Sequence, residues 1–297
     1  MKTIVSHYYN ALFKGFGQIM LQGNAITGIL FIAAIFYDSA LMGVAGIVSN
    51  LVGIGTAKLM KFNDEDIENG LYGFNASLIG VALIFYFQSN IWVWLAIVLA
   101  SVIATIAMGY AVKYKLPAYT FPFVGMTWIT LFVLSIPELA IPSVPEHFVD
   151  IQELDDFLIE GHAFGQVIFQ GSFIAGVIFF LGVFISKPIN ALYAFVAVMI
   201  SVFISHYVDI SDDLVKEGVL SFNAVLCGIA MGGDKVRDGI YVLVSVTIAT
   251  YIDALMIEYG WTALTFPFVF SMWLMYPIRR FDGWLVDKYF SKKQEIA

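Results

Sequence analysis

Gly70-Leu71-Tyr72-Gly73-Phe74-Asn75-Ala76-Ser77-Leu78-Ile79-Gly80 returns later in the chain as Gly218-Val219-Leu220-Ser221-Phe222-Asn223-Ala224-Val225-Leu226-Cys227-Gly228. Phe74 and Phe222 hold the same place in the two stretches, so the copies lie 148 residues apart (222 − 74). This spacing is half of the 297-residue chain, which indicates that the whole chain is made of two copies of one pattern.

Two further landmarks keep the same order in both copies. Phe16-Gly17-Gln18-Ile19-Met20-Leu21-Gln22-Gly23 returns 148 residues later as Phe164-Gly165-Gln166-Val167-Ile168-Phe169-Gln170-Gly171. Thr120-Phe121-Pro122-Phe123 returns 145 residues later as Thr265-Phe266-Pro267-Phe268. Each copy therefore carries a Gln, a Phe-Asn pair and a Thr-Phe-Pro-Phe, in that order.

The composition is that of a membrane protein. Hydrophobic residues make up 60% of the chain and charged residues only 13%, with a mean hydropathy of +0.84, whereas about a quarter of the residues of a soluble domain are charged. The apolar runs do not alternate, which argues against a barrel, and the lack of a basic stripe argues against a nucleic-acid partner. Cys227, the single cysteine, excludes an intrachain disulfide and is expected to fill the core. We expect no removable signal peptide.

Apolar segments long enough to cross a bilayer as helices occur five times in each half. This predicts an all-α polytopic membrane protein with ten transmembrane helices. The predicted spans are 17–37, 39–57, 70–88, 91–112, 119–137, 164–186, 189–208, 218–232, 238–257 and 264–278. Because five is odd, the second half begins on the opposite side of the membrane and is inverted relative to the first.

The basic residues support this topology, because Lys and Arg are retained on the cytoplasmic side. With the N-terminus inside and ten spans, fourteen of the fifteen Lys and Arg residues lie inside, and only Lys216 lies outside. Both termini are then cytoplasmic. We divide the chain into a first inverted repeat at 1–140, an acidic extracytoplasmic connector at 141–163, a second inverted repeat at 164–280 and a cytoplasmic tail at 281–297.

Inverted repeats place a site near the bilayer midplane, where matching helices are broken. Pro122 and Pro267 predict one pair of breaks that frees the carbonyls of Ala118 and Ala263, because proline has no N–H to donate. A second pair of breaks is expected at residues 15–18 and 161–166, where amphipathic approach helices (4–16 and 151–164) would end.

Polar side chains occur in symmetric pairs near these breaks. They are the amides Gln18, Gln166, Asn75 and Asn223 and the hydroxyls Thr120 and Thr265. Such groups are costly in the membrane unless they are paired. Two interpretations remain open, bonding between helices and the lining of a shared pore, and the matched positions favour the second for the threonines.

Aromatic and aliphatic pairs accompany the amides. Phe74 and Phe222 precede the two asparagines, and Leu78 and Leu226 follow one turn later. Two rings that face each other across an axis would form a flat slot for a planar molecule. Leu21 and Phe169 form a less symmetric pair, three residues beyond Gln18 and Gln166.

Ionisable residues are scarce inside the spans. Asp253 is the clearest acid there and has no counterpart in the first half, so it is interpreted as structural. No nucleophile elbow, phosphate-binding loop or metal-binding motif occurs, so neither an enzyme nor a cofactor is expected. The pore lining instead suits a small, neutral, planar solute that is rich in N–H donors, and urea fits this description.

The octapeptide Leu116-Pro117-Ala118-Tyr119-Thr120-Phe121-Pro122-Phe123 resembles the LPxxTxPF signature of the urea transporter family in full. The resemblance implies two half-membrane pore helices besides the ten spans, a pore in each protomer, a homotrimer in the lipid bilayer, and passive urea permeation. It assigns Phe74 and Phe222 to the selectivity filter, and Leu78 and Leu226 to the apolar residues that pack around it. Thr120 and Thr265 become the constriction, and Gln18, Gln166, Asn75 and Asn223 become urea ligands.

The chain departs from the family pattern at two places. The second copy, Trp261-Thr262-Ala263-Leu264-Thr265-Phe266-Pro267-Phe268, lacks the opening Leu-Pro, and Leu21 stands where an aromatic ring would extend the stack. Two alternatives stay open: a channel for another small neutral solute such as ammonia, short amides or water, and an ion-coupled transporter. The expected location is the cell membrane, and specifically a bacterial inner membrane.

Overall fold

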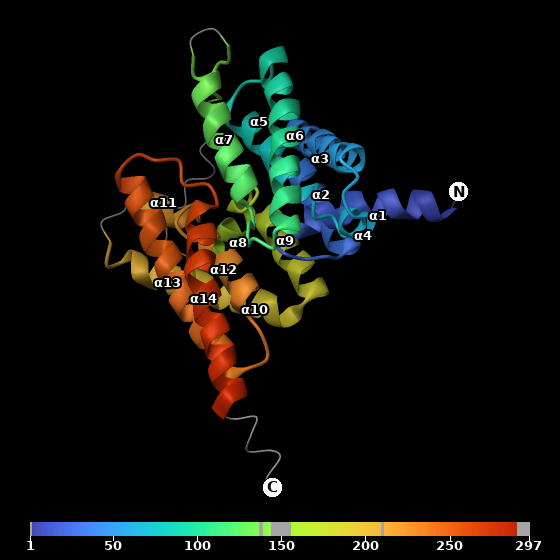
Figure 1. Ribbon diagram of the computed structural model, residues 1–297. Helices are drawn as coiled ribbons and strands as arrows, with labels where there is room; N and C mark the ends of the chain where they lie inside the picture. The colour runs from blue at the N-terminus through green and yellow to red at the C-terminus, as the bar shows by residue number, and fades with distance from the viewer. Residues whose placement is uncertain (1, 137–138, 144–155, 209–210, 290–297) are drawn as a thin grey trace.

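The computed structural model describes residues 2–136, 139–143, 156–208 and 211–289, and this part of the chain folds into fourteen helices (Figure 1). The helices of the first half are α1 (Lys2–Gln18), α2 (Ala25–Asp38), α3 (Ala40–Leu59), α4 (Asp64–Glu68), α5 (Phe74–Tyr86), α6 (Ile91–Lys113) and α7 (Phe121–Leu134). Those of the second half are α8 (Asp156–Gln166), α9 (Phe173–Ser186), α10 (Pro188–Ser205), α11 (Asp212–Lys216), α12 (Phe222–Met231), α13 (Val236–Glu258) and α14 (Phe266–Tyr289).

The helix starts follow the offsets found in the sequence. Helices α2 to α5 begin 148 residues before α9 to α12, as with Ala25 and Phe173 (173 − 25). Helices α6 and α7 begin 145 residues before α13 and α14, as with Phe121 and Phe266 (266 − 121). The short helices α4 and α11, which the sequence analysis missed, obey the same offset, so the missed elements are also a matched pair.

Each predicted approach helix ends at its glutamine, Gln18 in α1 and Gln166 in α8. Leu21 and Phe169 follow with φ of 60° each, in the left-handed region that side chains rarely adopt. In the first half Asn24 then restarts the helix, because its side-chain oxygen accepts a bond from the Ile26 N–H at 2.8 Å. The predicted spans 17–37 and 164–186 are therefore each wrong as one helix, because the chain turns between α1 and α2 and again between α8 and α9.

The turns before α5 and α12 explain why the spans predicted at 70–88 and 218–232 begin too early. Gly70 and Gly218 have φ of 78° and 73°. A Cβ at Gly70 would lie 2.3 Å from the Gly15 nitrogen, and one at Gly218 would lie 2.4 Å from the Ala163 nitrogen. Glycine is therefore required at both positions, and it lets the end of α1 or α8 approach the turn closely.

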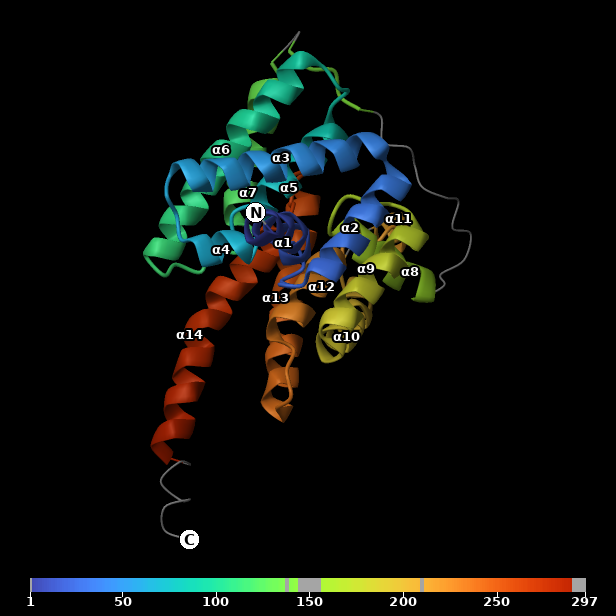
Figure 2. The same ribbon diagram turned by 90° about the vertical axis from the view of Figure 1, so that its right-hand side faces the viewer.

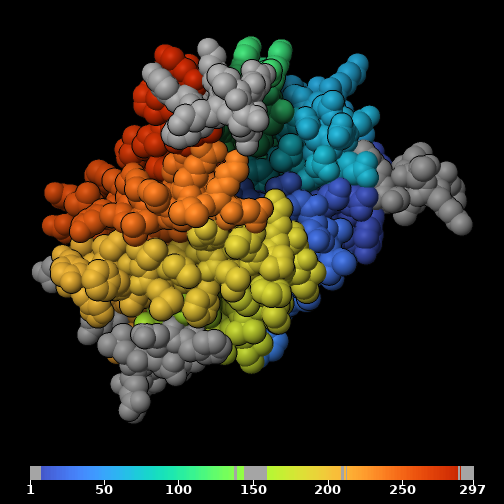
Figure 3. Space-filling model, turned by 90° about the horizontal axis from the view of Figure 1, so that it is seen from below, coloured from blue at the N-terminus to red at the C-terminus, as the bar shows by residue number. Residues whose placement is uncertain are grey.

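The two halves pack against each other through α2 and α9, which lie side by side in Figures 1 and 2. The Thr27 hydroxyl donates to the Gly182 carbonyl at 2.7 Å. The Phe31 and Phe179 rings meet edge to face at 5.0 Å, and both are fully buried. From below, the blue-to-cyan first half and the yellow-to-red second half cover separate areas of the surface (Figure 3).

Four helices of the described chain, α3, α6, α10 and α13, are long and apolar enough to cross a membrane on their own. Five more apolar helices, α2, α5, α7, α9 and α12, are shorter. The chain is therefore an all-helical, multi-pass membrane protein. The last helix, α14, continues to Tyr289, well past its predicted end at 278, and it carries Pro277 in its interior. Residues 144–155 of the predicted connector and 290–297 of the predicted tail lie outside the described residues.

Candidate functional site

Thr120 and Thr265 meet where the two halves join. Each lies directly before a helix, α7 or α14, and each is only 2% exposed. Their hydroxyl oxygens are 2.7 Å apart and share one hydrogen bond, in which either can be the donor. One hydroxyl proton and three lone pairs stay available, so this pair can still bind a solute that carries both donors and an acceptor.

The proline prediction needs correction. Pro122 is the second residue of α7 and Pro267 the second residue of α14, so neither breaks a helix in its middle. Proline fits the first helical turn, because the N–H groups there have no partner inside the helix. The carbonyls of Ala118 and Ala263 are not free, since the N–H groups three residues later bond them at 2.9 and 3.1 Å.

Asn75 and Asn223 hold the turns that carry the threonines. The Asn75 carbonyl oxygen accepts from the Phe123 N–H at 3.0 Å, and its NH₂ group reaches the Tyr119 carbonyl at 3.4 Å. Asn223 repeats this with Phe268 at 3.2 Å and Leu264 at 3.1 Å. Each amide thus caps a helix from a distant part of its own half.

The two turns have the same backbone conformation. Tyr119 and Leu264, the residues before the threonines, have φ of 47° and 48°. Such values are unfavourable for side chains of this kind. We conclude that the capping amides help to keep each turn in this conformation, so the asparagines shape the site even where they do not touch a solute.

Asp253 makes the two halves unequal. Its buried carboxylate oxygen Oδ2 accepts from Asn223 Nδ2 at 2.8 Å. The other oxygen, Oδ1, has no hydrogen-bond partner in the described part of the chain. The matching residue in the first half is Met108 (253 − 145), whose thioether is only a weak acceptor and carries no charge. The amide orientation of Asn223 is therefore fixed more firmly than that of Asn75.

The two predicted glutamines, Gln18 and Gln166, differ in their hydrogen bonding. Gln18 donates from Nε2 to the Asn69 carbonyl at 3.0 Å. Gln166 is half-buried and forms no side-chain hydrogen bond within the described residues. Two glutamines that were not predicted as site residues, Gln22 and Gln170, are fully buried and donate to nearby carbonyls, while their Oε1 atoms stay unpaired among the described groups. Gln22 and Gln170 occupy the same position in the two copies of the repeated motif, and this match could have identified them from the sequence.

Phe74 and Phe222 are the first residues of α5 and α12. Phe74 is buried and Phe222 is half-buried, while Leu78 and Leu226 are completely buried one turn later. No ring contact within the described chain joins the two phenylalanines. The slot between these rings therefore stays a prediction.

Leu21 and Phe169 have matching backbone conformations but different surroundings. The Phe169 ring lies 5.2 Å from Phe85 and 6.3 Å from Phe123, so it belongs to an aromatic cluster beside the start of α7. Leu21 is half-buried against the hydrophobic core. The predicted asymmetry of this pair is therefore visible in the packing.

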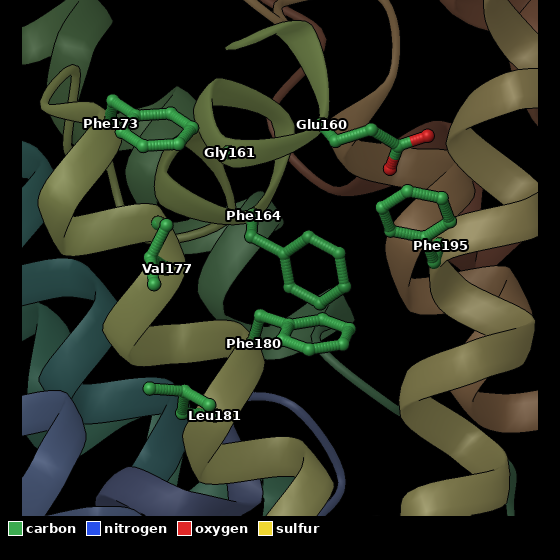
Figure 4. Close-up of a pocket in the computed structure, with 9 residues that line it drawn as sticks. Glu160, Gly161, Phe164, Phe173, Val177, Phe180, Leu181 and Phe195 are labelled. Atoms are coloured by element: carbon green, nitrogen blue, oxygen red, sulfur yellow. The ribbon is translucent and has the colours of Figure 1, made fainter. Parts of the chain in front are cut away.

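A separate cavity of about 260 Å³ lies among α8, α9 and α10 (Figure 4). The rings of Phe164 and Phe180 meet edge to face there at 5.4 Å, and Glu160 lies beside Phe195 at one edge. None of the paired threonines, asparagines or glutamines lines it. Its apolar lining offers few groups to bind a polar solute, so the candidate site is at the threonines.

Taken together, the helices and the paired polar side chains define a multi-pass membrane protein with a buried polar junction between two halves. A family model of the urea transporters matches residues 9–280. The chain therefore belongs to the urea transporter family, as its resemblance to the family signature indicates.

Curated relatives agree with this assignment. The chain is 25% identical to urea transporter 1 of Rattus norvegicus over 250 residues and 24% identical to that of Mus musculus. Each alignment covers 78% of this chain and 65% of the relative. It is also 24% identical to urea transporter 1 of Ovis aries over 238 residues, which is 74% of this chain and 62% of that relative. The chain thus spans slightly less than two thirds of the length of these relatives.

Proposed function

We propose that this protein is a channel for the passive transport of urea, with a pore in each protomer of a homotrimer. The proposal rests on family membership and on one observation, the 2.7 Å contact between the Thr120 and Thr265 hydroxyls at the junction of the halves. Buried oxygens at this point can accept urea N–H groups in place of water, each bond contributing about 1 kcal/mol net. Weak sites of this kind suit conduction, because the solute must also leave.

The proposed architecture has ten spans in two inverted repeats, each with a half-membrane pore helix. Both termini are cytoplasmic, and the membrane is a bacterial inner membrane. Gln18, Gln166, Asn75 and Asn223 contribute urea-binding groups, and Phe74 and Phe222 form the walls of the slot, with Leu78, Leu226, Leu21 and Phe169 around them. The retention of Lys and Arg inside supports this orientation.

The test is the flux of labelled urea into vesicles that contain the purified protein. We expect uptake that rises in proportion to the urea concentration and is unchanged when ion gradients are collapsed. Loss of uptake on collapse of the gradients would favour the ion-coupled alternative. Faster flux of acetamide or methylammonium than of urea would favour a channel for another neutral solute or for ammonia.

A further inference from the structure

Two tryptophans link the halves through the turns that carry the threonine pair. Trp128 donates its indole N–H to the Thr262 carbonyl at 2.7 Å. Trp273 donates to the Pro117 carbonyl, also at 2.7 Å. The two donors are 145 residues apart (273 − 128), and so are the two acceptors (262 − 117). The repeat therefore forms the same contact twice, once from each half. Each bond crosses from one half of the protein to the other.

The acceptor carbonyls belong to the turns that carry the threonines. Pro117 precedes Thr120 by three residues, and Thr262 precedes Thr265 by three. The asparagine of the same half holds each turn at the residue just before the threonine. Each turn is therefore tied at one point to its own half and at another to the opposite half.

The tryptophan rings reinforce these bonds. Trp273 packs on Phe121 at 5.0 Å, and Trp128 packs on Phe266 at 5.3 Å. Each of these phenylalanines directly follows a threonine of the central pair. Both tryptophans are half-buried, in contrast to Trp92 and Trp261, which are 50% and 64% exposed.

We propose that Trp128 and Trp273 are positioning residues that fix the separation of the Thr120 and Thr265 hydroxyls and so set the size limit of the passage. This inference rests on the proposed urea permeation. A turn that loses its cross-link can move outward with its threonine, which admits a broader solute. Each turn is held by one of the two indole bonds, so the loss of both bonds should widen the passage more than the loss of either one.

The test compares Trp128→Phe, Trp273→Phe and the double variant with the wild type. Phenylalanine keeps a ring and removes the N–H. Trp94→Phe is the control, because Trp94 is also half-buried and donates its indole N–H to Ser89 at 3.0 Å, in an exposed bond that stays within one half and does not involve the turns of the threonines. The readout is the ratio of 1,3-dimethylurea to urea permeability of vesicles, measured by stopped-flow light scattering.

We expect the ratio to rise about three- to tenfold in the double variant, which corresponds to the loss of one or two hydrogen bonds, and to stay unchanged in the control. An unchanged ratio in a folded double variant would overturn the proposal. Where the phenylalanine variants do not fold, β-(3-benzothienyl)alanine at both positions keeps the shape of the ring and removes only the N–H.

A second readout does not depend on transport. In protein labelled with ¹⁵N-tryptophan, the indole protons of Trp128 and Trp273 are expected to exchange with deuterium much more slowly than that of exposed Trp92. If the wild type passes no urea, the proposed function fails, while slow exchange would still support the cross-link. Exchange as fast as that of Trp92 would refute the cross-link itself.

Discussion

The buried Thr120–Thr265 contact is the residue-scale feature on which the proposed urea permeation rests. It is an unusual use of two hydroxyls, since a threonine inside a membrane helix usually bonds its own backbone, as Thr130 does with the Met126 carbonyl at 2.7 Å. Thr120 and Thr265 instead stand directly before their helices, so no helical turn precedes them, and their hydroxyls bond each other rather than a backbone carbonyl. Their hydroxyls are therefore free to serve each other or a solute.

Replacing both threonines with valine should slow urea flux without unfolding the protein. Removal of both partners of a buried hydrogen bond is close to neutral for stability, whereas the passing solute loses contacts worth about 0.5–1.5 kcal/mol each, or roughly three- to tenfold in rate. Stopped-flow flux and thermal unfolding in detergent measure the two effects. Thr130→Val is the matched control in the same helix, and equal flux in the double variant and the control would contradict this role.

Asp253→Asn distinguishes a positioning carboxylate from an ion-coupling one. An asparagine oxygen can still accept from Asn223 Nδ2, so the contact of 2.8 Å is kept while the charge is lost. We therefore expect urea flux within about twofold of the wild type, since the bond that is retained is the one that orients the amide. Abolished flux, with wild-type flux dependent on an ion gradient, would show that the charge itself is needed.

At the scale of elements, most of the fold follows from local signals. Asn24, Ser39 and Asn90 cap helices as their residue types suggest, and the ends of α1 and α8 fall where the repeated glycines and glutamines predict them. Pro122 misled the prediction, because the same residue suits a helix start as well as a break. The five-residue helices α4 and α11 escaped it because they are too short to show a helical period.

The sequence predicted which residues of the candidate site correspond in the two halves, but not which hydrogen bonds these residues form. The repeat alone indicated that Thr120 and Thr265 belong together, and the structure brings them into contact. Nothing local to Asn75 or Trp128 indicates that one caps a helix 48 residues away or that the other crosses to the opposite half. Such bonds depend on tertiary packing, which a single sequence does not encode in any short stretch.

Close helix crossings make a further prediction at this scale. Gly28 in α2 faces the Phe13 carbonyl, and Gly176 in α9 faces the Gly161 carbonyl, and at each glycine an added Cβ would lie 1.7 Å from the oxygen. Gly28→Ala and Gly176→Ala should each destabilise the protein by about 1–3 kcal/mol through overpacking. Thermal unfolding in detergent measures the effect.

Gly55→Ala is the control for these variants, because an added Cβ at that position in α3 meets nothing within 4 Å. Alanine favours a helix by about 0.5–1 kcal/mol over glycine, so the control should be slightly more stable than the wild type. If Gly55→Ala lowered the stability as much as Gly28→Ala and Gly176→Ala do, the close approach of α1 to α2 and of α8 to α9 would not be the cause of the destabilisation.

At the scale of the whole molecule, two similar halves contribute to one candidate site, and their contributions are not identical. The packing of Phe31 on Phe179 and the contact of Thr120 with Thr265 each join equivalent positions of the two copies. Elsewhere the copies diverge, as with Asp253 and Met108. In the proposed pore, a solute therefore meets two similar sets of groups, of which the one with Asn223 is held by an additional hydrogen bond.

The inversion of the halves is directly testable with single cysteines. Cys227 is buried, so the wild-type background should not react with a membrane-impermeant maleimide. Glu65 and Asp213 are exposed and occupy matching positions (213 − 65 = 148), and so do Lys113 and Glu258 (258 − 113 = 145). We expect cysteines at 65 and 113 to be labelled from the cytoplasmic side and those at 213 and 258 from the opposite side, because an odd number of spans per half exchanges the two faces. Labelling of both members of a pair from the same side would mean that the halves are parallel, and a pore built on an axis in the membrane plane would then be excluded.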